Sequence, residues 1–492
     1  MKSLLRLAQF RTYTQSHSKV FKSAREALYD VKDGDSVSMG GFGIVGIPEN
    51  GVFALIDMGV KDINIISNLA GIAEYGIGLM LQKGQVKRMN GSYVGENPVF
   101  ERQYLNGEIE LNLIPQGTLA ERCRAGTNGI GAMYVKAGVG TLVETGGFPV
   151  RLGEGGKSIV KVSKPKEKRT FDGKEYLLEE ALRCDFAMIR GYKADHKGNV
   201  RFRKTARNFN PDMAGMARVN VLEVEEIVDE LRPEEIHLPG CFIDRVYKGE
   251  HFPKKIERLR FDLGDQKSMG SMSGKDEKRI KIAKRAMKEL KAGFYCNLGI
   301  GIPTLIANFV IGKIDMDLQS ENGIVGVGPY PKKHQVDSDM INAGKETITA
   351  KLGYAIGRSS ETFGQMRGLH LHMTMLGGME VSETGDLANW IVPGQKVKGM
   401  GGAMDLVSCG SKVVVTMEHT SKGASKVLPK CSLPLTGKGV VSKLVTEMAV
   451  FEFVDNKMIL TEIAPDVTLE QVKASTLAHY TVSPNLKKIE YD

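Results

Sequence analysis

The 492-residue sequence lacks the features that mark a membrane-spanning, disulfide-stapled or metal-binding protein. No apolar run approaches the roughly 20 residues that a membrane helix needs. The six cysteines form no Cys-x-x-Cys pair, so their spacing indicates neither a zinc site nor a disulfide framework. The nine histidines include no His-Glu-x-x-His motif. We therefore expect a protein of a reducing compartment that neither crosses a membrane nor binds a metal ion.

Acidic residues are missing from the beginning of the chain, where the first one is Glu26. Residues 1–17 contain Lys2, Arg6 and Arg11, several hydroxyl side chains, and leucines at helical spacing. This composition is typical of a mitochondrial presequence, so we predict a protein of the mitochondrial matrix. The alternative is a disordered cytosolic tail.

The whole chain is basic, with a formal net charge of +9 and a pI near 9.0. Such a balance could indicate nucleic-acid binding or an anion-binding regulator. Part of the excess lies in the first 17 residues and the rest is spread along the chain, so an anionic small molecule explains it equally well. We expect no nucleic-acid partner.

The length exceeds one ordinary domain, and the sequence contains an internal repeat. The first half is expected to contain a strand at 36–39, a helix with Pro48 in its first turn and a strand at 63–67. The second half repeats this order, with a strand at 294–296, a helix through 305–309 and a strand at 313–318. The Gly-Ile-Pro triplets at 46–48 and 301–303 are 255 residues apart.

The repeat continues further along the chain: 186–198 resembles 373–385, and 219–225 resembles 413–419. We predict two similar open α/β domains from an internal duplication, with the active site between them. The predicted segments are an N-terminal domain at 18–257, a linker at 258–275 and a C-terminal domain at 276–492.

The most informative stretch is 320–329, Ser-Glu-Asn-Gly-Ile-Val-Gly-Val-Gly-Pro. It places Glu321 after a strand, in a loop whose glycines permit close backbone approach. A carboxylate in such a loop can act as a nucleophile, whereas the alternative is that Glu321 only caps a turn. The equivalent position of the first half is Asn68, and a carboxylate in one copy only indicates a single site shared by both halves.

A second glycine-rich stretch, Gly41-Phe-Gly-Ile-Val-Gly46, matches the dinucleotide-binding pattern G-x-G-x-x-G. That site also needs an acidic residue at the end of the second strand, where this chain has Asn68. The pattern therefore does not favour a nicotinamide cofactor.

Three stretches together resemble the signatures of family I CoA transferases: 320–329, 40–50 (Gly-Gly-Phe-Gly-Ile-Val-Gly-Ile-Pro-Glu-Asn) and 399–405 (Gly-Met-Gly-Gly-Ala-Met-Asp). The resemblance runs in order along nearly the whole chain after residue 17. It implies that the α and β subunits of the family are fused here, and that the protein is a homodimer.

The resemblance also implies a chemistry. Glu321 would attack an acyl-CoA and carry CoA as a glutamyl thioester, in ping-pong transfer from succinyl-CoA to a small acid, such as the 3-oxo acid acetoacetate of ketone-body metabolism. No cofactor is implied, since CoA is a substrate. The implied active-site contacts are Asn68, Gln116, Asn297, Gly401 and Gly402. The implied CoA-binding residues are Gly323, Gly326, Gly328 and Lys345.

Three alternatives stay open at this stage. The acceptor could be acetate, because acetate:succinate CoA transfer occurs within the same family. An acyl-CoA hydrolase would share acylation of Glu321 but admit water. A non-catalytic anion-binding protein would have no use for a carboxylate at 321 opposite Asn68.

Overall fold

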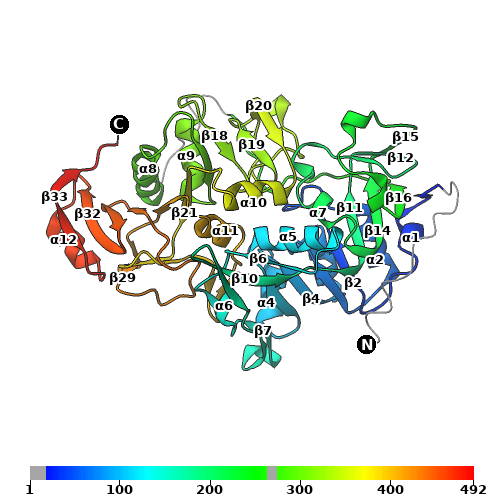
Figure 1. The fold of residues 1–492 in the computed structure, drawn as a ribbon, viewed down its shortest axis with the longest axis horizontal. Helices are drawn as coiled ribbons and strands as arrows, with labels where there is room; N and C mark the ends of the chain where they lie inside the picture. Colours follow the sequence, from blue (N-terminus) through cyan, green and yellow to red (C-terminus); the bar gives the residue numbers. More distant parts are fainter. Residues whose placement is uncertain (1–17, 263–273, 492) are drawn as a thin grey trace.

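The structure is a computed structural model that describes residues 18–262 and 274–491 (Figure 1). The predicted presequence at 1–17 and most of the predicted linker lie outside the described residues. The first half is built on an eight-stranded sheet in which every pair of neighbours is parallel, in the order β1-β16-β14-β11-β2-β3-β4-β5. These strands are β1 (Val20–Phe21), β2 (Ser36–Met39), β3 (Ile63–Ile66), β4 (Val86–Gly91), β5 (Glu110–Leu113), β11 (Cys184–Arg190), β14 (Ala217–Val224) and β16 (Arg245–Lys248).

The second half contains a ten-stranded mixed sheet in the order β20-β19-β18-β17-β21-β26-β30-β31-β32-β33. Its five central strands, from β18 to β30, are parallel, and antiparallel pairs flank them on both sides. The strands are β17 (Tyr295–Leu298), β18 (Asp317–Gln319), β19 (Ile324–Val327), β20 (Ala350–Ile356), β21 (Met373–Gly377), β26 (Lys412–Thr416), β30 (Lys443–Val445), β31 (Ala449–Val454), β32 (Lys457–Ile463) and β33 (Thr481–Lys488).

Helices and smaller strands complete both halves. The helices are α1 (Ala24–Ala27), α2 (Glu49–Met58), α3 (Ile77–Gln82), α4 (Pro98–Leu105), α5 (Gln116–Thr127), α6 (Leu142–Thr145), α7 (Asn210–Met213), α8 (Gly274–Met287), α9 (Ile302–Val310), α10 (Ser359–Arg367), α11 (Ala403–Ser408) and α12 (Leu469–Ser475). An excursion from the first half contains β6 (Ala132–Val135), β7 (Pro149–Leu152), β8 (Ile159–Val162), β9 (Lys168–Phe171) and β10 (Lys174–Glu180). No helix in the described ranges is long and apolar enough to cross a bilayer.

The two sheets confirm the predicted duplication. In the first half β11 pairs in parallel with both β2 and β14, and in the second half β21 pairs in parallel with both β17 and β26. Likewise β3 lies beside β2 and β18 beside β17. The halves differ beyond that point, because β4 is parallel to β3 whereas β19 turns back antiparallel to β18. Asn68 and Glu321 therefore follow equivalent strands.

Two predicted boundaries need correction. The strand expected at 313–318 begins only at Asp317, because the N–H groups of Lys313 and Ile314 both donate to the Val310 carbonyl at 3.0 Å and turn the chain at the end of α9. Pro48 is the N-cap of α2 and not a first-turn residue. It has a ψ of 78°, which is outside the helical range.

The hydrophobic core crosses the boundary between the two halves of the chain. Trp390, Met400 and Met404 belong to the second half of the sequence, yet they are buried among first-half residues in one apolar cluster. The Trp390 indole N–H donates to the Leu435 carbonyl at 3.0 Å, which satisfies its buried polar atom. The segment 390–404 thus reaches across the seam and fixes the second half against the first.

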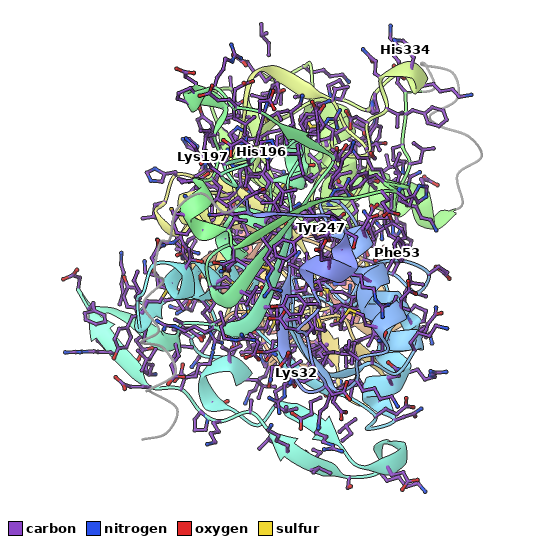
Figure 2. The ribbon with its side chains drawn as sticks, turned by 90° about the vertical axis from the view of Figure 1, so that its right-hand side faces the viewer. Lys32, Phe53, His196, Lys197, Tyr247 and His334 are labelled. Atoms are coloured by element: carbon purple, nitrogen blue, oxygen red, sulfur yellow. The ribbon has the colours of Figure 1, made fainter. Side chains whose placement is uncertain are left out.

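Figure 2 views the molecule from the end formed by the first half, with Tyr247 near the centre and His334 at the rim. Tyr247 is 1% exposed, and its hydroxyl donates to the Glu223 carboxylate at 2.7 Å. Glu223 also accepts the N–H of Gly51 in α2 at 3.0 Å, so α2 is held against the sheet. Glu223 lies near the carboxyl end of β14, and Asn68 follows the carboxyl end of β3 in the same parallel sheet.

Candidate active site

Glu321 lies in a tight turn between β18 and β19. The Ser320 N–H donates to the Ile324 carbonyl at 2.8 Å, which closes the turn. Gly323 has φ of 108°, and a Cβ there would lie 2.3 Å from the Gly357 carbonyl oxygen, so both the turn and its contact require glycine. The Thr362 hydroxyl of α10 donates to the Glu321 carbonyl oxygen at 3.2 Å. The backbone that carries Glu321 is therefore fixed from two sides.

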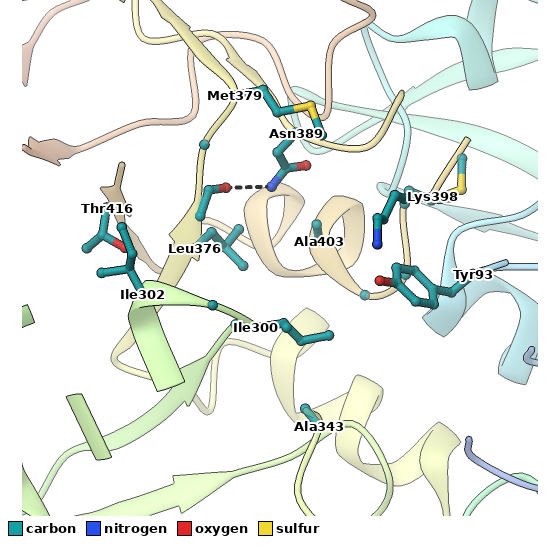
Figure 3. A pocket seen from close by; sticks show the side chains of 18 of the residues that line it. Tyr93, Ile300, Ile302, Ala343, Leu376, Met379, Asn389, Lys398, Ala403 and Thr416 are labelled. Atoms are coloured by element: carbon teal, nitrogen blue, oxygen red, sulfur yellow. Dashed lines mark hydrogen bonds between the residues drawn. The ribbon is translucent and has the colours of Figure 1, made fainter. Parts of the chain in front are cut away.

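Glu321 is one of the residues that line a cavity of about 620 Å³, to which both halves contribute. Figure 3 shows part of this cavity from close by. Asn68 and Gln116 come from the first half, and Gly401, Gly402 and Lys345 come from the second. Tyr93 and Lys398 lie on one side of the view, and Ile302 and Thr416 lie on the other. The structure thus brings Glu321 and five of the other predicted site residues into one space at the seam.

Two side-chain amides form a pair in the wall of this cavity. The Gln116 Nε2 donates to the Asn68 Oδ1 at 2.6 Å, and this contact fixes which way each amide points. The Asn68 Nδ2 is buried, and within the described ranges it has no hydrogen-bond partner. Since buried donors are normally paired, an unpaired amide in a cavity wall is available to a ligand oxygen.

The Gly401–Gly402 turn packs directly against the Glu321 carboxylate. A Cβ on Gly402 would lie 2.6 Å from Glu321 Oε1, closer than any side chain allows. The Gly401 N–H donates to the Ser92 carbonyl at 3.3 Å, and the Gln116 N–H donates back to the Gly401 carbonyl at 3.0 Å. These bonds across the seam hold the turn, and in the described part of the chain the Gly402 N–H has no protein acceptor.

The pKa of Glu321 is raised to about 7, chiefly by burial and also by the nearby carboxylate of Asp405. Asp405 is fully buried in α11, and its Oδ2 accepts the Gly117 N–H of α5 at 2.8 Å. Lys345 acts in the opposite direction, as a cation that favours ionised Glu321. A carboxylate of higher pKa is the stronger nucleophile once ionised, so this environment suits covalent catalysis near neutral pH.

We predict that Asp405→Asn shifts the pH profile of kcat/KM toward lower pH. The wild-type rate should rise with pH through about 7 as Glu321 ionises, because only the anion is nucleophilic. Removal of the like charge lowers the pKa of Glu321, so the rise should begin at lower pH. Asp466→Asn, on an exposed side chain of the same half, is the control. An unchanged midpoint in Asp405→Asn would contradict the electrostatic coupling.

Lys345 is buried at the end of the cavity near Glu321. Its side chain is 4% exposed, its Nζ lies 3.6 Å from Glu257 Oε1, and it sits over the Tyr93 ring at 4.7 Å. Burial lowers the pKa of Lys345, while the Glu257 carboxylate counteracts this effect. Lys345 also adopts φ of 62°, a conformation that a non-glycine residue rarely takes outside a constrained turn.

The family model described as Coenzyme A transferase matches residues 21–249 and 279–475, which is most of the chain. The chain belongs to the coenzyme A transferase family. Among curated proteins, mouse mitochondrial succinyl-CoA:3-ketoacid coenzyme A transferase 2A is 50% identical over 470 residues, which are 94% of this chain and 90% of the relative.

A bacterial relative, the succinyl-CoA:3-ketoacid coenzyme A transferase of Helicobacter pylori (strain 26695), consists of two separate polypeptides. The first is 48% identical to this CoA transferase over 244 residues, which are 49% of this chain and 97% of that polypeptide. The second is 56% identical over 205 residues, which are 42% of this chain and 99% of that polypeptide. These matches support the prediction that two subunits are fused in one chain.

A solved structure of an Escherichia coli O157:H7 acyl-CoA transferase, described as a thioester complex with CoA, has the same fold. Its TM-score is 0.75 at 22% identity, and the match covers 96% of this chain and 95% of that one. This likeness concerns the fold alone.

Four of the predicted contacts of this CoA transferase are not in the cavity lining. Asn297 is fully buried beneath it, where its Nδ2 donates to Gln319 Oε1 at 2.9 Å and supports β18. Gly323, Gly326 and Gly328 pack instead against the segment 349–357. A Cβ added to any of these three glycines would lie only 2.3 to 3.0 Å from the nearest atom of that segment. These glycines permit close packing of the β19–β20 hairpin, so the structure places none of these four residues in the wall of the cavity.

Several cavity residues were not identified from the sequence. They are Tyr93, Glu96, Arg258, Arg279, Lys398 and Lys426. Asp405 was also missed, although it ends one of the stretches that carried the family resemblance. A single sequence gives little signal for these residues, because scattered charged side chains more often face solvent than a cavity.

Proposed function

We propose that this CoA transferase moves CoA from succinyl-CoA to a 3-oxo acid such as acetoacetate, with Glu321 as the covalent carrier. The names of the mouse and Helicobacter pylori relatives support these substrates. The observation that carries the proposal is the place of Glu321, in a cavity that both halves line and whose wall contains the unpaired buried amide of Asn68. A glutamate that only capped a turn would need neither a shared cavity nor an unpaired amide in its wall.

The reaction begins when a Glu321 oxygen attacks the thioester carbonyl. The C–S bond breaks, CoA leaves as the thiolate, and an acyl-glutamyl anhydride remains. The thiolate then attacks the Glu321 side-chain carbonyl, which releases the first carboxylate and forms a glutamyl-CoA thioester. The acceptor carboxylate repeats both steps in reverse order. One thioester replaces another, so neither ATP nor a cofactor is required.

Each attack develops negative charge on a carbonyl oxygen, and the site has donors for it. Among the described residues of the cavity, the Asn68 Nδ2 and the Gly402 N–H are two neutral donors without a protein acceptor. Donors that are fixed before the reaction need no reorganisation as the charge forms. Neutral donors also avoid forming an ion pair with Glu321, which would lower its nucleophilicity.

The charges along the cavity suit a long anionic substrate. Arg279 and Lys426, both from the second half, line it. We assign these side chains to the phosphates of CoA. The Arg279 side chain is 42% exposed although it lies 3.5 Å from Glu418, whereas Lys345, predicted from the sequence to bind CoA, is 4% exposed and faces Glu257. Binding of the remote CoA chain can then drive the step at the carbonyl.

Three finer features of the proposal rest on the family resemblance and the names of relatives. We propose a mitochondrial protein, as the mouse relative is named, with residues 1–17 as its presequence. We also propose a homodimer, which light scattering of the purified protein will test. Acetate is a second acceptor within the same chemistry.

The proposed function is tested by comparing the rate of CoA transfer to an acceptor acid with the rate of succinyl-CoA hydrolysis. Purified enzyme with succinyl-CoA should form acetoacetyl-CoA only when acetoacetate is present, with little free CoA in its absence. Steady-state rates with acetate in place of acetoacetate will rank the acceptors. Rapid release of free CoA without any acceptor would instead identify a hydrolase.

A further inference from the structure

The segment that joins the two halves contributes to the cavity wall. Residues 250–262, here called the connector, lie outside the ranges that the family model matches. Arg258 of the connector lines the cavity that contains Glu321. The connector is therefore more than a tether between the halves.

Backbone contacts hold the connector beside the loop that carries Lys345. Arg258 forms a parallel bridge with Glu346, and the Thr347 N–H donates to the Arg258 carbonyl at 3.3 Å. The Arg260 N–H donates to the Thr347 hydroxyl at 2.9 Å. These bonds give Arg258 a defined position, as recognition of a small molecule requires.

The neighbouring side chains form a charged group that contains three cations. Arg258 Nη2 lies 2.8 Å from Glu96 Oε1, which also lies 3.9 Å from Lys398 Nζ. Glu257 faces Lys345. The three cations are balanced by Glu96, Glu257 and Glu321 while Glu321 is ionised. When Glu321 is acylated and neutral, a formal charge of +1 remains, which suits one additional carboxylate.

Arg258 is the cation in this group that can best receive that carboxylate. Its side chain is 35% exposed, compared with 4% for Lys345, which is occupied by Glu257 and the Tyr93 ring. Lys398 Nζ already donates to the Gly95 carbonyl at 3.0 Å. Arg258 has five N–H donors, and in the described residues its side chain forms a hydrogen bond only with Glu96.

We propose that Arg258 is a specificity residue, which binds the distal carboxylate of the succinyl group while Glu321 reacts with its thioester end. This inference rests on the proposed function. The succinyl group carries a charge that an acetoacetyl group lacks, so Arg258 favours one acyl partner over the other. A planar guanidinium is suited to this role because it can grip a carboxylate through two parallel hydrogen bonds.

The test compares two acids of equal length, succinate and butyrate, which differ by one carboxylate. Binding is measured by calorimetry on Glu321→Gln enzyme, whose neutral side chain resembles the acylated state. Adding Arg258→Gln should weaken succinate binding about ten- to hundredfold, the range for a hydrogen bond to a charged group. Butyrate binding should change less than about twofold, and Arg258→Lys should give an intermediate loss for succinate.

Steady-state kinetics give the second readout. In otherwise wild-type enzyme, Arg258→Gln should raise KM for succinyl-CoA and leave KM for acetoacetyl-CoA nearly unchanged. Arg260→Gln is the matched control, because its exposed side chain lies two residues further along the connector and outside the cavity lining. It should affect neither acid.

The outcomes separate this inference from the proposed function. If Arg258→Gln weakens the binding of succinate and butyrate equally, Arg258 has a structural role and the assignment is overturned. Succinate binding that does not depend on Arg258 would overturn it as well. If wild-type enzyme fails to use succinyl-CoA while succinate still binds through Arg258, the proposed function fails and the recognition of a dicarboxylate stands.

Discussion

Replacement of Glu321 by alanine is expected to lower the rate of CoA transfer by at least ~10³-fold, as for other covalent nucleophiles. The neighbouring carboxylate of Asp405 cannot take its place, because Asp405 is fully buried, accepts the Gly117 N–H, and is not part of the cavity lining. The fold should survive, because Glu321 forms no side-chain ion pair in the described residues and its turn is held by backbone bonds.

Mass spectrometry provides the direct evidence for this prediction. Wild-type enzyme incubated with succinyl-CoA, then digested, should yield a CoA adduct on the peptide that contains Glu321. Glu321→Gln, which keeps the shape of the side chain, should yield none and should be nearly as inactive as Glu321→Ala. Turnover close to that of the wild type in either variant would refute the assignment of the nucleophile.

The second large effect is expected from one added methyl group at Gly402. A Cβ there would lie 2.6 Å from Glu321 Oε1 and 3.1 Å from the Phe363 ring. The carboxylate must move to relieve this overlap, and a displacement of about 1 Å can cost roughly 10²-fold in rate. We therefore expect Gly402→Ala to lower kcat/KM about a hundredfold, and to slow formation of the Glu321 adduct to a similar extent.

Gly364→Ala is the matched control for that variant. Gly364 lies in α10, which packs beside the same site, but a Cβ there would meet no atom within 4 Å. In a helix, alanine is favoured over glycine by up to about 1 kcal/mol, so this change should preserve activity and slightly raise thermal stability. If both variants retain full activity, the close packing around Glu321 is not required for catalysis.

The repeat within the sequence was sufficient to predict the architecture. Near-equal offsets between strand, helix and strand units indicated equivalent positions in two sheets, and Asn68 and Glu321 occupy such positions. Local pattern could not predict where the sheets diverge. The alternation at 313–318 resembles a strand, but hydrogen bonding to Val310 continues the end of the helix through its first residues.

Site residues that belong to short sequence motifs could be predicted, whereas residues that only tertiary packing brings to the cavity could not. Glu321, Asn68, Gln116 and Gly402 were found in this way. The glycines after Glu321 were assigned to CoA because glycine permits close approach, but they pack against the segment 349–357, which contains β20. Arg258 was placed in a linker, since nothing local shows that a chain between two domains lies against a cavity.

The segment 390–404 has a consequence for how the molecule loses its structure. Its apolar side chains complete the core of the opposite half, so parting the halves would expose Trp390 and Met404 to water and leave a void behind. We therefore expect neither half to unfold while the other stays intact. Heat or denaturant should therefore produce one cooperative transition, and partial damage to either half will abolish the seam where the chemistry occurs.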